Sequence, residues 1–271
     1  MKRREFVGLV VPLAAGAALS VYSVGAVAAN AEKKSITVGA DTTFPPFETE
    51  KNGEVTGFDI DMIKGIAKAA GLSLTIRTMP FEGIIPSLQA GEIDAAVAGI
   101  TITKARMKNV DFSDAYYKSG LSVLVKADSK IKDFSDLKGH VVATKKGTSS
   151  VTYLTSHGFD LGHVKEFQNI SSAYQALEIG EVDAVLFDNP VNVNFELGHK
   201  NVKVVGGLLT GEYYGIAISR KDPWLVAKIN AGLAELRKSG EYQKLFVEWF
   251  GEDKSGLVEG LEPPASVAVT D

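Results

Sequence analysis

Apolar and polar positions alternate along the chain in a way that predicts short buried strands separated by amphipathic helices. Residues 35–39 have the pattern of a strand, and residues 60–70 place their isoleucines and alanines on one helical stripe that ends before Gly71. A later helix is predicted to begin at Asp222 and Pro223 and to end at Gly240. Strands that alternate with helices indicate a layered α/β fold.

An eight-residue pattern occurs twice. Residues 88–95 read Leu-Gln-Ala-Gly-Glu-Ile-Asp-Ala, and residues 177–184 read Leu-Glu-Ile-Gly-Glu-Val-Asp-Ala. Each copy reads as the end of a helix, a glycine stop and a buried strand, which predicts two similar lobes. The two strands lead to Gly99 and Asp188, and ligands of open α/β sheets bind beyond the carboxyl ends of strands.

Two extended apolar stretches predict how the lobes are connected. Residues 119–125 would carry the chain out of the first lobe, and residues 208–218 would bring it back, so that two crossings form a hinge. The predicted fold is therefore two doubly wound α/β lobes joined by a two-stranded hinge. Lobe 1 comprises residues 35–119 and 214–251, and lobe 2 comprises residues 120–213. Residues 252–271, which show no helical or strand period, are predicted to form a flexible tail.

The first 31 residues have the pattern of a signal peptide. Lys2, Arg3 and Arg4 precede an apolar stretch that ends at small residues near Ala31. A permanent membrane anchor is the alternative, but the stretch contains glycine and proline and ends in an Ala-x-Ala triplet. The arginine pair fits a twin-arginine export motif about as well as an ordinary basic leader. We expect an exported, periplasmic protein.

Composition and charge exclude several functions. Hydrophobic residues make up 45% and charged residues 23% of the chain, as in a globular protein. Loss of residues 1–31 removes three cations and one anion, so the formal net charge moves from −4 to −6, and nucleic acid is not an expected partner. There is no cysteine for a disulfide, a nucleophile or a lipid anchor. The four histidines lack metal-ligand spacing, and no phosphate-binding loop occurs, so neither a metal nor a cofactor is predicted.

Candidate binding residues lie at predicted loops and strand ends. Phe44 and Phe81 each neighbour proline, and each is either a core residue or a platform for a ligand. Arg106 falls in the first turn of a helix that Thr103 would cap, where a cation opposes the helix dipole and suggests a compensating carboxylate. Residues 145–150 form a polar turn before a helix, and its N–H groups suit an anion, although simple N-capping explains the turn as well.

Seven short motifs occur between residues 35 and 251: Phe44-Pro45-Pro46-Phe47-Glu48, Gly57-Phe58-Asp59-Ile60-Asp61, Phe81-Glu82-Gly83-Ile84-Ile85-Pro86, Ala98-Gly99-Ile100-Thr101-Ile102-Thr103, Asp111-Phe112-Ser113, Tyr116-Tyr117-Lys118-Ser119-Gly120 and Trp249-Phe250-Gly251. With these motifs the chain resembles the family-3 periplasmic amino-acid-binding proteins of ATP-driven importers over residues 35–251. This resemblance implies the type II periplasmic-binding-protein fold, no enzymatic activity, a monomer and delivery of the ligand to a permease in the inner membrane.

The resemblance also implies a role for each candidate residue. Aromatic rings would sandwich the aliphatic stem of an amino acid, a guanidinium and backbone N–H groups would hold its α-carboxylate, and a carboxylate and a carbonyl would hold its α-ammonium. A ligand with both charges would bridge the lobes and stabilise their closure. Phe44 and Phe81 would supply the rings. Arg106 and the N–H groups of Thr101 and of Thr148 or Ser149 would hold the α-carboxylate, and Asp188 and the carbonyl of Gly99 would hold the α-ammonium.

The residues left for the ligand side chain are Asp41 and Lys145. A neutral amide can donate to the first and accept from the second, which favours glutamine. Basic amino acids, held through Asp41, and glutamate are the alternatives. Phe187 stands where glutamine-binding members of the family carry histidine, which weakens the glutamine assignment. A periplasmic dehydratase on the same fold is a remote alternative, with Lys145 or Glu82 as its general acid.

Overall fold

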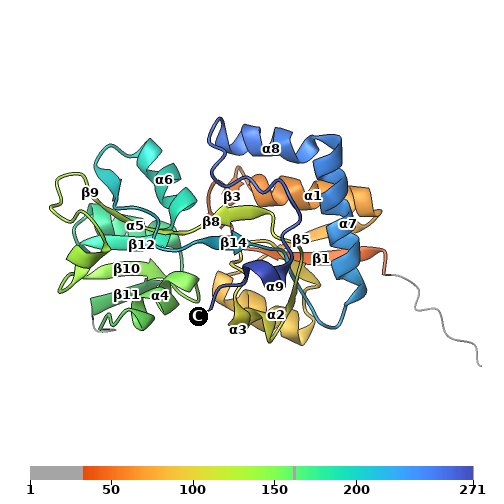
Figure 1. Ribbon diagram of the computed structural model, residues 1–271, viewed down its shortest axis with the longest axis horizontal. Helices are drawn as coiled ribbons and strands as arrows, with labels where there is room; N and C mark the ends of the chain where they lie inside the picture. The colour runs from red at the N-terminus through yellow and green to blue at the C-terminus, as the bar shows by residue number, and fades with distance from the viewer. Residues whose placement is uncertain (1–32, 161–162, 271) are drawn as a thin grey trace, which may run out of the picture. The chain divides into compact units, whose positions relative to one another are not determined.

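The structure, a computed structural model, describes residues 33–160 and 163–270, so the predicted signal peptide lies outside the described residues. The described residues form two five-stranded sheets, each flanked by helices, and the chain crosses between them through β8 and β14 (Figure 1). This is the predicted two-lobed α/β architecture. No helix in the described ranges is long and apolar enough to cross a membrane.

The sheet of lobe 1 has the order β5-β1-β6-β15-β7, in which β5, β1 and β6 are parallel and β15 is antiparallel to both neighbours. Helices α1, α7 and α8 cover one face, and η1, α2 and α3 lie on the other (Figure 1). The bounds are β1 Ser35–Ala40, β5 Ser73–Thr78, β6 Ala95–Ala96, β7 Asp111–Phe112, β15 Ala217–Ile218, α1 Phe58–Ala70, η1 Phe81–Gly83, α2 Ile84–Ala90, α3 Lys104–Met107, α7 Trp224–Ser239 and α8 Glu241–Phe250.

The sheet of lobe 2 repeats this order as β11-β10-β12-β9-β13. Strands β10, β11 and β12 are parallel, and β9 is antiparallel to its neighbours β12 and β13. Central strands β6 and β12 each follow a helix and a left-handed glycine, Gly91 and Gly180, which confirms the repeated unit. The bounds are β9 Leu121–Lys126, η2 Phe134–Leu137, β10 Val142–Lys145, α4 Ser149–Ser156, β11 Val164–Phe167, α5 Ile170–Glu178, β12 Ala184–Asp188, α6 Asn189–Gly198 and β13 Val202–Val205.

The helix ends predicted at glycines are confirmed. Gly71 and Gly240 adopt φ values of 69° and 80°, the left-handed conformation that stops α1 and α7. Helix α1 starts at Phe58, two residues before the predicted stripe, because the N–H groups of Phe58 and Asp59 bond to carbonyls of the preceding loop. A small sheet of β2 (Thr43–Phe44), β3 (Glu48–Lys51) and β4 (Glu54–Thr56) holds that loop.

The crossing between the lobes is narrower than the apolar stretches suggested. It consists of β8 (Tyr117–Ser119) paired antiparallel with β14 (Glu212–Tyr214). Residues 121–126 form β9 inside the second sheet, where their side chains are mostly buried. Hydrophobicity alone marks both a hinge strand and a core strand, and only the pairing separates them.

The segment predicted to be a flexible tail instead packs on lobe 1 and includes a short helix, α9 (Pro264–Val267). Leu257 forms a bridge with Tyr117, and Val269 forms a bridge with Thr103. Val258 is buried. The few apolar side chains of this segment lack a period, so its packing depends on partners more than 130 residues earlier in the chain, which the sequence pattern does not reveal.

Candidate functional site

The carboxyl ends of four strands meet between the lobes: β1 and β6 from lobe 1, β10 and β12 from lobe 2. The residues after these strands, with Arg106 and Phe81, surround a narrow cavity. All the predicted site residues except Asp41 line it. The lining residues are Phe44, Phe81, Ala98, Gly99, Thr101, Arg106, Lys145, Thr148, Ser149, Phe187 and Asp188.

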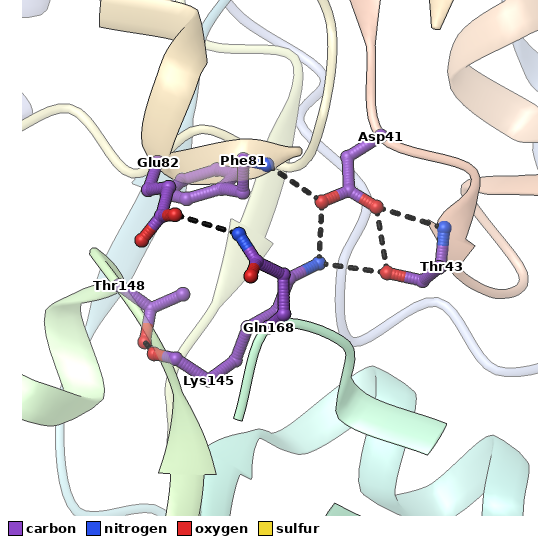
Figure 2. Close-up of polar contacts among 7 residues, drawn as sticks. All are labelled: Asp41, Thr43, Phe81, Glu82, Lys145, Thr148 and Gln168. Carbon is purple, nitrogen blue, oxygen red and sulfur yellow. Dashed lines mark hydrogen bonds and ion pairs between the residues drawn. The ribbon is translucent and has the colours of Figure 1, made fainter. Parts of the chain in front are cut away.

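Asp41 lies behind the cavity and pairs with a cation from the other lobe. One carboxylate oxygen accepts from the N–H of Phe81 at 2.8 Å and pairs with Lys145 Nζ at 2.8 Å, and the other accepts from the N–H and hydroxyl of Thr43 (Figure 2). Both charged groups are buried. The two charges predicted to read a ligand side chain therefore neutralise each other across the cleft.

Lys145 also lies beside the two predicted aromatic platforms. Its ammonium is 6.0 Å from the ring centre of Phe44 and 5.8 Å from that of Phe81, and it donates to Thr43 Oγ1 at 3.0 Å. These distances are typical of cation–π contacts. The two rings thus favour a cationic or polarised group between them.

Arg106 lies in α3, where Thr103 caps the helix by accepting from the N–H of Arg106 at 3.1 Å, as predicted. Its guanidinium donates to the carbonyls of Thr101 at 2.8 Å and Gly147 at 3.1 Å, and it stacks 5.2 Å from the ring centre of Phe81. The helix has only four residues, and backbone carbonyls face the cation, so the dipole argument for a compensating anion is not needed. The contacts instead orient the guanidinium at the cavity.

The turn before α4 is built differently from a simple helix cap. Thr148 occupies the N-cap position, but its hydroxyl donates to the carbonyl of Lys145 at 2.7 Å and makes no cap hydrogen bond. The N-capping interpretation is therefore wrong for the Thr148 side chain. A helix N-terminus at the edge of the cavity favours an anionic ligand group.

Asp188 ends β12 and is buried. It accepts a short hydrogen bond from the hydroxyl of Tyr214. Burial and, to a smaller extent, the charge of Glu212 raise the pKa of Asp188 to about 7, although the hydrogen bond from Tyr214 and the charge of Arg106 oppose the rise. A cationic group that enters the cavity would stabilise the ionised carboxylate.

Glu212 is a site residue that the sequence reasoning missed. This buried hinge residue accepts from Thr101 Oγ1 at 2.9 Å, Ser149 Oγ at 3.1 Å and Thr210 Oγ1 at 3.0 Å. It therefore joins lobe 1, lobe 2 and the hinge. A polar Thr-Gly-Glu run within an otherwise apolar stretch was the only signal for it.

Two further residues complete the surroundings. Phe187 is fully buried and packs edge to face on Phe44, with ring centres 5.7 Å apart. It gives the cavity an apolar wall at the position where the sequence departs from the glutamine-binding members of the family. Glu82 accepts from Gln168 at 2.6 Å and faces Lys146 at the rim, so this candidate acid already has partners (Figure 2).

Sequence comparison shows that the chain is similar to bacterial solute-binding proteins. The sequence model described as "Bacterial extracellular solute-binding proteins, family 3" matches residues 36–252. The chain is 38% identical over 225 residues to the glutamine-binding protein of an ABC transporter from Bacillus subtilis (strain 168), which covers 80% of each sequence.

The chain is also similar to solved structures of amino-acid-binding proteins. A structure of an ancestral arginine-binding protein bound to arginine is 43% identical and has a TM-score of 0.76, covering 80% of this chain and 99% of that one. A structure of an ancestral arginine-binding protein bound to glutamine has the same identity and TM-score and covers 81% and 99%.

Proposed function

Because this chain belongs to family 3 of the bacterial extracellular solute-binding proteins, we propose that it is the substrate-binding component of an ATP-driven importer. It is exported to the periplasm, closes its two lobes around one free polar amino acid and presents it to an inner-membrane permease. The chain acts as a monomer and catalyses no reaction. The placement of Arg106 and Asp188 at one cavity, from different lobes, is the observation that carries this proposal.

The two charges match the invariant part of an amino acid. Arg106 offers a fork of N–H donors to the α-carboxylate, and the N–H groups of Thr101 and of Thr148 or Ser149 supplement it. Asp188 and the carbonyl of Gly99 receive the α-ammonium. Each charge of the zwitterion is thereby paired, and the ligand links the two lobes.

Glutamine is the ligand that the side-chain end favours. Asp41 and Lys145 form a buried pair with no net charge, so a charged ligand side chain would meet one partner of like sign. A neutral amide meets no like charge from either partner, and it can accept from Lys145, which lines the cavity. The comparisons support both candidates, since similar proteins bind glutamine or arginine. Basic amino acids remain the alternative, and Phe187, which offers no hydrogen bond, is the residue that weakens the glutamine assignment.

A thermal-shift screen of the twenty amino acids on the mature chain tests the ligand. A ligand raises apparent stability by about RT ln(1 + [L]/Kd), so millimolar glutamine with a micromolar Kd adds about 4 kcal/mol. We expect glutamine to give the largest shift. A shift with arginine, lysine and histidine alone would replace glutamine with a basic ligand, and no shift with any amino acid would refute the proposal.

Calorimetry on Arg106→Ala tests the clamp. Loss of the guanidinium leaves the ligand carboxylate poorly paired, which costs about 2–5 kcal/mol. The Kd should therefore rise by roughly 30-fold to several thousand-fold. Arg77→Ala is the matched control, because Arg77 lies on β5 in an exposed ion pair with Glu92. An affinity within about threefold of the wild type for Arg106→Ala would contradict the assignment.

A further inference from the structure

Two carboxyl groups lie fully buried against each other in lobe 1, outside the cavity. Glu48 begins β3 and Asp59 is the second residue of α1, and both side chains have 0% exposure. The N–H of Asp59 bonds to the carbonyl of Phe47 at 3.1 Å, which places Glu48 beside it. Gly57 makes this approach possible, since a Cβ there would lie 2.0 Å from the carbonyl oxygen of Phe47.

The hydrogen-bond donors around the pair are too few for two carboxylates. Asp59 Oδ2 accepts from the N–H of Gly99 at 3.1 Å and from the hydroxyl of Tyr116 at 2.6 Å. In the described part of the chain, Asp59 Oδ1 and both carboxyl oxygens of Glu48 have no donor. The two carboxyl groups are neighbours, and each affects the pKa of the other. A buried carboxylate without a donor or a cation is strongly unfavourable.

The neighbouring charges do not compensate for a second anion. The groups that act on Glu48 are Asp59, Asp41 and Lys145, and Tyr116 lies against the same carboxyl pair. Lys145 is already paired with Asp41 at 2.8 Å. Burial raises the pKa of Glu48 well above its ordinary value, and the charge of Asp59 raises it further.

The geometry also indicates which carboxyl group carries the proton. Asp59 lies in the first turn of a thirteen-residue helix, where a negative charge is favourable, and it has two donors. Glu48 has neither advantage. We infer that Glu48 is a neutral carboxylic acid that donates its proton to Asp59 Oδ1, and that the Asp59 carboxylate so completed positions the Gly99 peptide at the binding cavity.

The second half of this inference rests on the proposed function, because Gly99 would receive the α-ammonium of the ligand. Gly99 adopts φ +52°, and a Cβ there would lie 2.2 Å from the Phe44 ring, so the peptide is held tightly from one side. From the other side, the Asp59 carboxylate holds this peptide by accepting a hydrogen bond from the N–H of Gly99. Glu48 and Asp59 are positioning residues, because neither lines the cavity, whereas Gly99, which donates to Asp59, does.

The protonation of Glu48 is tested by comparing the unfolding equilibria of the wild type, Glu48→Gln and the control Glu50→Gln between pH 5 and pH 8. Glu50 lies exposed on the same strand. The unfolded chain releases the Glu48 proton above its ordinary pKa, whereas the folded chain retains it. The unfolding constant of the wild type relative to Glu48→Gln should therefore rise by up to about tenfold per pH unit. For Glu50→Gln the ratio should stay constant. A constant ratio for Glu48→Gln would overturn the inference.

An infrared spectrum of the wild type tests the protonation of Glu48 without depending on whether any variant folds. At pH 8 Asp188, whose pKa is about 7, is mostly ionised, so a carbonyl band of a protonated carboxyl group should come from Glu48. Absence of that band at pH 8 would overturn the inference.

The positioning role is tested with L-glutamine and L-arginine as calorimetric probes. Glu48→Ala removes the donor to Asp59 and should raise the Kd at least about tenfold, and Glu48→Gln, whose amide can still donate, should recover most of that loss. Failure of the amide to recover affinity in a folded protein would refute the positioning role. If the wild type binds no amino acid, the proposed function fails, but the pH and infrared results still decide the proton.

Discussion

At the scale of single residues, the site contains more carboxyl groups than the single α-ammonium of a neutral amino acid requires. Asp188 and Glu212 are both buried, and each acidic charge disfavours the other. Hydroxyl donors stabilise both: Tyr214 donates to Asp188, while Thr101, Ser149 and Thr210 donate to Glu212. The pKa of Asp188, at about 7, lies in the range where binding can be measured.

Ligand affinity should therefore depend on pH through Asp188. An α-ammonium pairs with the ionised carboxylate, so protons compete with the ligand below the pKa of about 7. We expect affinity to be constant above about pH 8 and to fall by up to about tenfold per pH unit well below pH 7. Calorimetry from pH 5 to pH 8.5 measures this, with Asp188→Asn as the variant that should lose the dependence. A flat profile in the wild type would contradict the assignment of Asp188.

Residue types and local spacing predicted much of this site but not its pairing. Motif positions placed Phe44, Gly99, Arg106 and Asp188 at loops and strand ends, and these residues line one cavity. The Asp41–Lys145 ion pair and the role of Glu212 were not foreseen, because both depend on how closely two separate lobes approach. No sequence period encodes that distance.

At the scale of elements, the hinge strand β14 links the two halves of the site. Glu212 accepts from Thr101, in the segment that follows β6, and from Ser149, the first residue of α4, so it binds both lobes at once. The hydrogen bond to Ser149 must lengthen if lobe 2 moves away from the hinge. Glu212 therefore favours the closed arrangement of α4 against β14.

Substitution of Glu212 should weaken closure and shift the pH response together. Glu212→Ala removes the acceptor of two interlobe hydroxyl groups, and hydrogen bonds to a charged group contribute about 1.5–3 kcal/mol. We expect the Kd for the preferred amino acid to rise by roughly 10-fold to 100-fold. The pH midpoint for Asp188 should fall, because the charge that raises its pKa is gone.

Calorimetry across pH and small-angle scattering of the liganded protein measure both effects. Glu166→Gln, on the exposed part of β11, is the matched control. Unchanged affinity together with an unchanged pH midpoint would show that Glu212 does not act on the site.

Elements with local signals were the most predictable part of the fold. Helices α1 and α7 end where Gly71 and Gly240 supply a left-handed residue, and this depends only on neighbouring positions. The limits of β8 and β9 could not be predicted in the same way. Both are short apolar strands, and their separation depends on which partner strand each one meets.

At the scale of the whole molecule, the C-terminal segment joins parts of lobe 1 that are distant in sequence. The N–H of Lys118 in hinge strand β8 donates to the carbonyl of Gly256 at 2.9 Å. The N–H of Lys104 in α3 donates to the carbonyl of Val269 at 2.9 Å. One segment thus holds the hinge strand and the helix that carries Arg106.

Removal of residues 252–271 should lower stability and loosen both attachments. Loss of the buried Val258 and of a few backbone hydrogen bonds, each contributing about 1 kcal/mol, predicts a decrease of about 2–4 kcal/mol in the free energy of unfolding. The amides of Lys104 in α3 and Lys118 in β8 should then exchange faster with solvent. Faster exchange at these two amides would show that the segment holds the hinge strand and the helix of Arg106, in addition to stabilising the fold.

Denaturant unfolding and hydrogen exchange measure these effects, and two point variants separate packing from chain length. Val258→Ala should cost about 1–2 kcal/mol, since its side chain is 1% exposed, whereas Leu261→Ala should cost little, since its side chain is 68% exposed. A truncated chain as stable as the full one, with unchanged exchange at Lys104 and Lys118, would mean that the segment contributes nothing to the lobe. A stability loss without faster exchange at these amides would confine its role to the core around Val258.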